Sequence, residues 1–121
     1  EKTPFGLLIC DEGHRLKNPS SQTTKALMSA PTKRRIILSG TPIQNDLGEF
    51  FTMSNFVNPG VLGTLNTFKK VFEQPIMKSR EPSCTPAEKE IGQKRSSTLS
   101  QKCQSFVLRR TADILEKYLP P

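Results

Sequence analysis

Two adjacent carboxylates near the start of the chain are the side chains best suited to catalysis. Asp11 and Glu12 follow the apolar run 7–10 and precede Gly13 and His14, the one histidine of the chain. An apolar run bounded by charge predicts a strand buried on both faces of a parallel sheet, and such sheets bind ligands at the carboxyl ends of their strands. There Asp11 could hold a Mg²⁺ that bridges nucleotide phosphates, and Glu12 could orient or deprotonate the attacking water. The alternative is a strand that simply leaves the sheet through solvated acids.

A second polar cluster, residues 39–45, follows another apolar run, residues 36–38. Between the two runs, residues 20–30 contain good helix formers, so the segment predicts a β-α-β crossover. Such a crossover makes the strands parallel and places both polar clusters at one edge. We therefore expect Ser39 and Thr41 to hydrogen-bond the two carboxylates and to sense the state of the nucleotide.

The rest of the chain has helical periodicity. Asp46 followed by Glu49 predicts the capped start of a helix that ends at 58–60, and a second helix is expected over 64–73. The phenylalanines of both are interpreted as packing residues, because no basic residues alternate with them as they would on a platform that stacks bases. Residues 74–85 predict a loop.

A further helix is expected from Pro86, with Thr85 as its cap. Its middle is polar, which predicts that it projects from the body. The apolar stripe of this helix is thin and consists of Ile91, Leu99, Cys103 and Phe106. A last helix is expected over 112–118, with Thr111 as its cap.

Composition narrows the class of protein. The 18 Lys and Arg residues exceed the 11 Asp and Glu residues, which suits a surface that binds polyanions. No segment resembles a signal peptide or a membrane span. The three cysteines show no Cys-x-x-Cys spacing, and reduced thiols are the simplest interpretation. No phosphate-binding Walker loop occurs in the chain, so we expect that loop to precede Glu1 in a longer protein.

Three motifs together carry a resemblance to a known family. They are residues 11–18 (DEGHRLKN), residues 39–45 (SGTPIQN) and residues 106–111 (FVLRRT). In sequence, order and spacing they resemble the Swi/Snf family of superfamily-two DNA translocases. Glycine at the third position of the first motif resembles the Rad-fifty-four-like recombination-repair branch. Residues 56–60, 79–83 and 117–121 are similar to its B-type members.

The resemblance implies an α/β fold, namely the C-terminal half of a RecA-like helicase lobe 1 with parallel strands, a crossover helix and a helical insertion. Residues 1–49 would carry the Walker B and Ser-Gly-Thr motifs, residues 50–105 the insertion, and residues 106–121 the end of the lobe and the start of a linker. The cofactors would be ATP and Mg²⁺, and the partners double-stranded DNA, a recombinase filament and chromatin in the nucleus, with no membrane. The residues implied at the nucleotide are Asp11 as metal ligand, Glu12 as catalytic base, and His14, Ser39, Thr41 and Gln44.

The basic residues allow more than one interpretation. Arg15 and Lys17 could form ion pairs within the lobe or reach across to a second lobe, and the resemblance gives Arg109 and Arg110 a part in inter-lobe coupling, with plain salt bridges as the alternative. Residues 33–35 predict a solvated turn, with a phosphate contact or a localisation signal as the alternative. Two other functions stay open, a DEAH-box RNA helicase and a non-hydrolysing DNA-binding or scaffold module.

Overall fold

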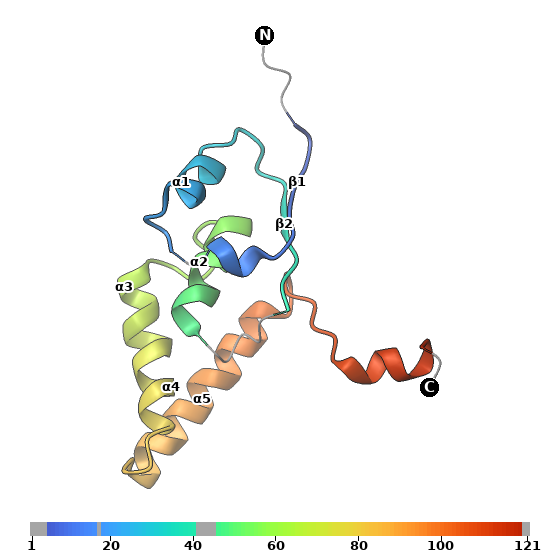
Figure 1. Cartoon of the computed structure of the whole chain (residues 1–121). Coiled ribbons are helices and arrows are strands. Elements are labelled where there is room, and N and C mark those ends of the chain that lie inside the picture. The colour runs from blue at the N-terminus through green and yellow to red at the C-terminus, as the bar shows by residue number, and fades with distance from the viewer. Residues whose placement is uncertain (1–4, 17, 41–45, 120–121) are drawn as a thin grey trace. The chain divides into compact units, whose positions relative to one another are not determined.

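The computed structural model describes residues 5–16, 18–40 and 46–119 (Figure 1). The chain divides into two compact units, Glu1–Gln74 and Pro75–Pro121, and each is described by itself. The first contains β1 (Leu8–Cys10), the 3₁₀ helix η1 (Gly13–Leu16), α1 (Gln22–Met28), β2 (Arg35–Ile37), α2 (Leu47–Val57), α3 (Leu65–Phe68) and the π-helical η2 (Lys69–Glu73). From α4 (Gln74–Ser79) the chain continues into the second unit, with α5 (Pro86–Cys103) and the 3₁₀ helix η3 (Ala112–Lys117).

The two strands are parallel, as the crossover pattern predicts. Leu8 pairs with Arg35, Ile9 with Ile36 and Cys10 with Ile37. The connecting helix α1 begins at the Ser21 cap, whose Oγ accepts a hydrogen bond from the backbone N–H of Thr24. A short polar cap before a run of helix formers is a local signal, which explains why the sequence alone locates this helix.

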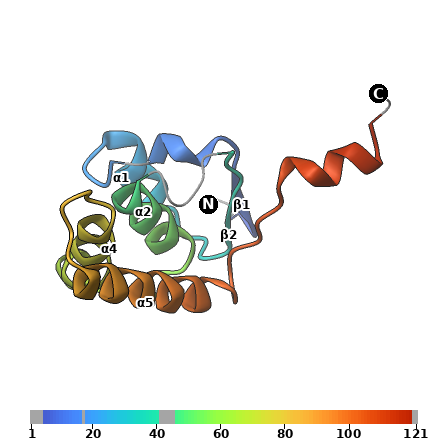
Figure 2. The same cartoon turned by 90° about the horizontal axis from the view of Figure 1, so that it is seen from below.

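The prediction of burial on both faces of the strands is wrong for the sheet of this chain. Ile9 and Ile36, which are paired on the same face, are 55% and 44% exposed. Within the first unit, α1 and α2 lie on one side of the strands (Figure 2). A two-stranded sheet with helices on one side only leaves its other side to solvent.

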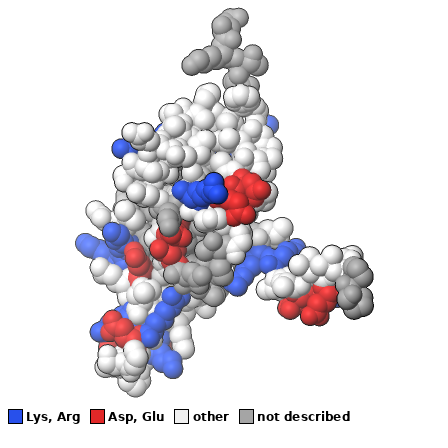
Figure 3. Space-filling model, in the orientation of Figure 1, with Lys and Arg blue, Asp and Glu red and all other residues white. Residues whose placement is uncertain are grey.

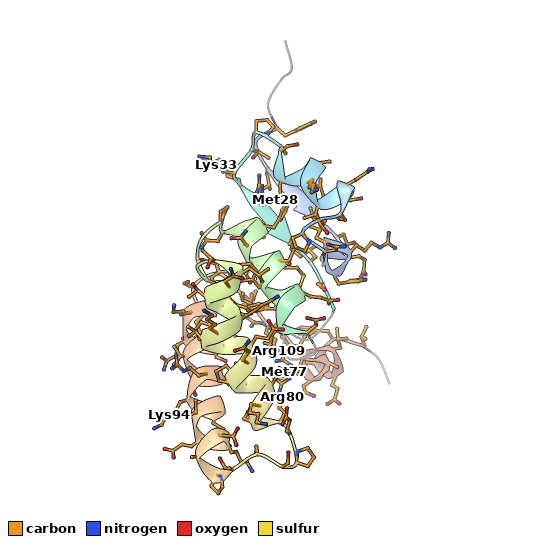
Figure 4. All side chains as sticks on the ribbon, turned by 90° about the vertical axis from the view of Figure 1, so that its left-hand side faces the viewer. Met28, Lys33, Met77, Arg80, Lys94 and Arg109 are labelled. Carbon is orange, nitrogen blue, oxygen red and sulfur yellow. The ribbon has the colours of Figure 1, made fainter. Side chains whose placement is uncertain are left out.

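Arg35 lies in β2 and is partly buried, so the prediction of a solvated turn over residues 33–35 is wrong at this position. Its guanidinium donates hydrogen bonds to four backbone carbonyls, and it lies 4.7 Å from the ring centroid of Phe56. The carbonyls are those of Met28 (3.1 Å), Ala30 (3.3 Å), Thr32 (3.2 Å) and Phe56 (3.0 Å). These contacts tie β2 to the end of α1 and the end of α2. Lys33 is exposed and points away from the body (Figure 4), as the sequence predicts.

The aromatic side chains form the core of the first unit, which confirms their interpretation as packing residues. The ring of Phe68 lies 5.0 Å from that of Phe51 and 5.7 Å from that of Phe72, and Phe50 and Phe56 are also buried. The helix α2 starts as predicted, with Asp46 accepting a hydrogen bond from the N–H of Glu49 at 3.0 Å.

The loop predicted over residues 74–85 is shorter than expected, because Gln74–Ser79 is helical. In the sequence, Pro75 suggests that no helix passes through this position. Pro75 is, however, the second residue of α4, where its missing N–H costs no hydrogen bond within that helix. The preceding π turn joins the N–H of Gln74 to the carbonyl of Lys69. Ile76, at 3% exposed, supplies the apolar burial that favours the helix.

In the second unit, Thr85 and Glu88 form the predicted capping box at the start of α5. The N–H of Glu88 donates to Thr85 Oγ1 at 3.2 Å, and the N–H of Thr85 donates to Glu88 Oε1 at 3.1 Å, which holds the pKa of Glu88 below its usual value. Leu99 and Cys103 are buried as predicted, but Ile91 is exposed. The buried residue next to it is Gly92, which faces Ser79 and Pro75 of the same unit.

The predicted last helix is the 3₁₀ helix η3, and Thr111 does not cap it through its side chain. Thr111 Oγ1 instead donates a hydrogen bond to Asp113 at 3.0 Å. No helix among the described residues is long and apolar enough to cross a membrane. The three cysteines are free thiols, and burial raises the pKa of Cys10 and of Cys103.

We expect Arg35→Lys to loosen the first unit, because an ammonium group cannot make the forked set of hydrogen bonds that a guanidinium makes. The loss should be about 1.5–3 kcal/mol in the opening free energy of the strands. Hydrogen exchange of peptides covering β1 and β2 measures it. The exposed neighbour provides the control, since Arg34→Lys should change exchange by less than about 0.5 kcal/mol. Equal exchange in the two variants would show that the Arg35 contacts do not stabilise the sheet.

Candidate active site

Asp11 and Glu12 lie at the same edge of the sheet as Ser39, the start of the second polar cluster. The pairing continues past the end of the strands, because Leu38 donates its N–H to the carbonyl of Cys10 and accepts from the N–H of Gly13, each at 2.9 Å. Asp11 and Glu12 therefore leave β1 beside the point where Ser39 leaves β2. The prediction that the crossover brings the ends of both strands to the same edge is confirmed by the backbone, while residues 41–45 of the second cluster lie outside the described residues.

Glu12 has a backbone conformation that residues other than glycine rarely adopt. Its φ is +54°, and it is the one non-glycine residue among those described with a positive φ. For an L-residue this left-handed conformation costs roughly 1–2 kcal/mol, and such strain is concentrated at active sites. The carboxylate of Asp11 supports the turn, since its Oδ1 accepts the N–H of Glu12 at 2.8 Å. The strain is thus located on the residue that the sequence assigns to water activation.

Gly13 is buried and has no positive φ, so this glycine is not the residue that makes the turn. It is needed for close packing instead. A Cβ built on Gly13 would lie 2.1 Å from Cγ2 of Ile37, far inside van der Waals contact. The turn falls on Glu12, and the glycine allows the chain after it to lie against β2.

His14 is directed back toward Glu12. Its Nδ1 lies 3.2 Å from Glu12 Oε2, and the two side chains are 39% and 61% exposed. Nδ1 itself is buried and makes no hydrogen bond of good geometry, so the contact becomes an ion pair only when the imidazole is protonated. The imidazole of His14 thus lies beside the Glu12 carboxylate.

Ser39, the first residue of the second cluster, is exposed at the same edge as Asp11 and Glu12. Its predicted hydrogen bond to these carboxylates stays a prediction. Two other predicted site residues, Thr41 and Gln44, lie outside the described residues, as does Lys17. The sensor role of this cluster stays a prediction.

The basic residues assigned to coupling are divided between the two units. Arg15 is exposed in η1, where its N–H donates to the carbonyl of Glu12 at 3.1 Å. Figure 3 shows basic and acidic atoms side by side over this part of the surface. Arg109 and Arg110 are exposed in the second unit, and the side chain of Arg110 donates to the carbonyl of Arg109. Their coupling roles stay predictions.

Two residues that the sequence analysis did not assign to the site help to shape it. Ile37 fills the space that a side chain on Gly13 would need, and Arg35 holds the same strand through its hydrogen bond to the carbonyl of Phe56. Both lie at alternate positions of β2, on the face paired with Leu8 and Cys10. The alternation of side chains in a strand was the available signal, because it places residues 35 and 37 on one face.

The exposed carboxylates at this edge can bind a cation and accept a proton. Asp11 Oδ1 is engaged by the backbone and Glu12 by His14, while each side chain stays exposed to a ligand from solvent. Carboxylate oxygens are the ligands that Mg²⁺ prefers. The described residues hold no group of three or more potential metal ligands, so a magnesium ion at Asp11 would take its other ligands from phosphates and water, and its binding there stays a prediction.

We expect the strain at Glu12 to be measurable in substitutions. Glu12→Asn should stabilise the first unit by about 0.5–1 kcal/mol, because asparagine tolerates the left-handed region better than other residues. Glu12→Val should destabilise it, because a β-branched side chain tolerates that region poorly. Hydrogen exchange at the amides of Gly13 and Leu38 reports both. A shift in the same direction for both variants would contradict strain as the cause.

Comparison with known proteins places the chain in a family. Residues 1–121 match the family described as SNF2-related domain. The chain is 57% identical over 117 residues to the human (Homo sapiens) DNA repair and recombination protein RAD54B, covering 97% of the chain and 13% of that protein. It is 52% identical over 120 residues to the human DNA repair and recombination protein RAD54-like, covering 99% of the chain and 16% of that protein.

A solved structure agrees with these relatives. The Sulfolobus solfataricus SWI2/SNF2 ATPase core in complex with dsDNA matches the chain with a TM-score of 0.68 and 32% sequence identity, over 92% of the chain and 21% of that structure. The chain thus spans a small part of the length of the proteins it matches. The fold, the motifs and the match over the whole chain together show that this chain belongs to the SNF2-related domain family.

Proposed function

We propose that this chain carries the Walker B and Ser-Gly-Thr motifs of the first RecA-like lobe in an ATP-dependent translocase on double-stranded DNA. The observation that carries the proposal is the shared edge of the sheet, where the backbone of Gly13 is bonded to that of Leu38. The two carboxylates follow β1 there, and Ser39 follows β2. Residues 50–105 would be the helical insertion of the lobe, and residues 106–121 its end and the start of a linker.

The residues would divide the chemistry of ATP hydrolysis between them. Asp11 would hold Mg²⁺, which when bound neutralises charge on the phosphates. Glu12 would accept the proton of the attacking water, and its positive φ forms the turn that holds it at the edge of the sheet. His14 would hold the Glu12 carboxylate through the 3.2 Å contact. Thr41 and Gln44 would complete the nucleotide-sensing turn with Ser39.

The relatives suggest where such a motor would work. Two are named DNA repair and recombination proteins, and the solved structure contains double-stranded DNA. We therefore propose DNA as the track, homologous recombination as the process, and a recombinase filament and chromatin in the nucleus as the targets. The net charge of +7 suits association with a polyanion. Family membership sets aside the DEAH-box RNA helicase, and a non-hydrolysing module of the same fold remains the competing hypothesis.

We expect Glu12→Gln to abolish DNA-stimulated ATP hydrolysis in the complete protein that contains this chain. The rate should fall by about 10²–10⁴-fold, because an amide cannot accept the proton of water, while nucleotide binding is retained. Phosphate release with and without duplex DNA, together with binding of a fluorescent nucleotide, measures both. Glu90→Gln on the exposed surface of α5 is the control. Unchanged turnover in Glu12→Gln would remove Glu12 from catalysis, and an inactive parent protein would favour the non-hydrolysing module.

We expect Asp11→Asn to raise the Mg²⁺ concentration needed for half-maximal turnover by about tenfold, since a neutral oxygen binds a hard cation more weakly than a carboxylate does. A titration of turnover against Mg²⁺ at fixed ATP measures the shift. Asp113→Asn, in the exposed η3, should leave the titration unchanged. The same Mg²⁺ requirement in Asp11→Asn and in the parent protein would show that another residue holds the ion.

A further inference from the structure

The side chain of Ile37 fills the space that a Cβ on residue 13 would need. Its Cγ2 lies 2.1 Å from the ideal Cβ position, while its Cβ and Cγ1 lie at 3.2 Å and 3.4 Å. Ordinary contact with a Cβ begins near 3.4 Å, so one methyl group accounts for most of the conflict. Any side chain at position 13 would have to displace Ile37 or lift the backbone off β2.

The backbone at this point is also fixed by hydrogen bonds. The N–H of Gly13 donates to the carbonyl of Leu38, the residue that follows Ile37, and the N–H of Leu38 donates to the carbonyl of Cys10. The chain between Cys10 and Gly13 consists of Asp11 and Glu12, so the two carboxylates lie in a short arc whose two ends are both hydrogen-bonded to Leu38. The positive φ of Glu12 closes that arc.

We propose that Ile37 is a positioning residue for the Glu12 carboxylate, which it sets by packing against the bare α-carbon of Gly13. The proposal rests on the proposed function, because Glu12 matters for turnover only if it activates water. Ile37 itself touches no reacting group. Ile37 sets the distance between the backbone of Asp11 and Glu12 and the strand β2, which precedes the Ser-Gly-Thr motif.

The shape of the side chain at position 37 then matters more than its size. Isoleucine and valine both carry two γ-carbons on Cβ, whereas leucine carries one and places its branch further out. A leucine can keep the volume of isoleucine while giving up the methyl group in conflict, and such swaps are tolerated in packed sites. A side chain without β-branching at position 37 should therefore make room for a new Cβ at position 13.

The test uses the complete ATPase that contains this chain, with two single and two double variants. Gly13→Ala should lower kcat by about a hundredfold, as expected for a catalytic group displaced by roughly 1 Å, with the KM for ATP changed by less than about twofold. Gly13→Ala combined with Ile37→Leu should recover kcat to within about threefold of Ile37→Leu alone. Gly13→Ala combined with Ile37→Val should stay as slow as Gly13→Ala.

Gly6→Ala is the matched glycine control, because its Cβ would meet no atom within 4 Å, and Ile36→Leu changes the exposed face of the same strand. Both should keep the kcat of the parent. Equal recovery with leucine and valine, or no recovery with either, would overturn the proposal. If Gly13→Ala alone does not fold, a folded and active leucine double variant supports the proposal, and an unfolded one overturns it. Glu12→Gln tests the proposed function separately, because it leaves positions 13 and 37 intact.

Discussion

The structure of the site depends on the pairing of two short parallel strands and on its extension by one residue. Leu38 lies beyond β2, yet it both donates to Cys10 and accepts from Gly13. Parallel strands need a crossover connection, and the segment that contains the seven-residue helix α1 provides it. Because side chains alternate along a strand, a shift of the register by one residue would turn Arg35 and Ile37 to the opposite face and separate them from the helices and from Gly13.

Local rules of structure are broken where the proposed chemistry is located. Glu12 is a charged, non-glycine residue in a left-handed conformation, and His14 buries a ring nitrogen without a well-formed hydrogen bond. Elsewhere in the described residues, the helix starts obey the usual capping rules at Ser21, Asp46 and Thr85. Proteins carry such irregularities where function requires them and surrounding packing maintains them. The contrast supports a functional interpretation of residues 11–14.

The sequence predicts those features that depend on neighbours along the chain. The caps at Asp46 and Thr85 involve residues three positions apart, and the helix ending near Asn58 is followed by proline and glycine. Contacts between distant residues were not predictable in the same way. Arg35 resembles a solvated charge until the carbonyl of Phe56, 21 residues further on, is known to accept from it. The role of Gly13 was likewise not predictable from its neighbours along the chain, because the glycine is required by the contact with Ile37 and not by its own backbone angles.

The face of β2 that carries Arg35 and Ile37 connects the aromatic core to the edge that carries the carboxylates. At one end of the strand, Arg35 packs over Phe56 and bonds its carbonyl, so the strand is fixed to α2. At the other end, two residues along the same face, Ile37 meets Gly13 beside the strained Glu12. A strand of three residues has little freedom to bend between these contacts, and packed interiors transmit displacement rather than absorb it. A change in the packing of α2 against Arg35 would therefore reach the carboxylates through Ile37, which makes β2 a physical route between the helical part of the first unit and the proposed site of ATP hydrolysis, beside the direct contact of α2 with η1.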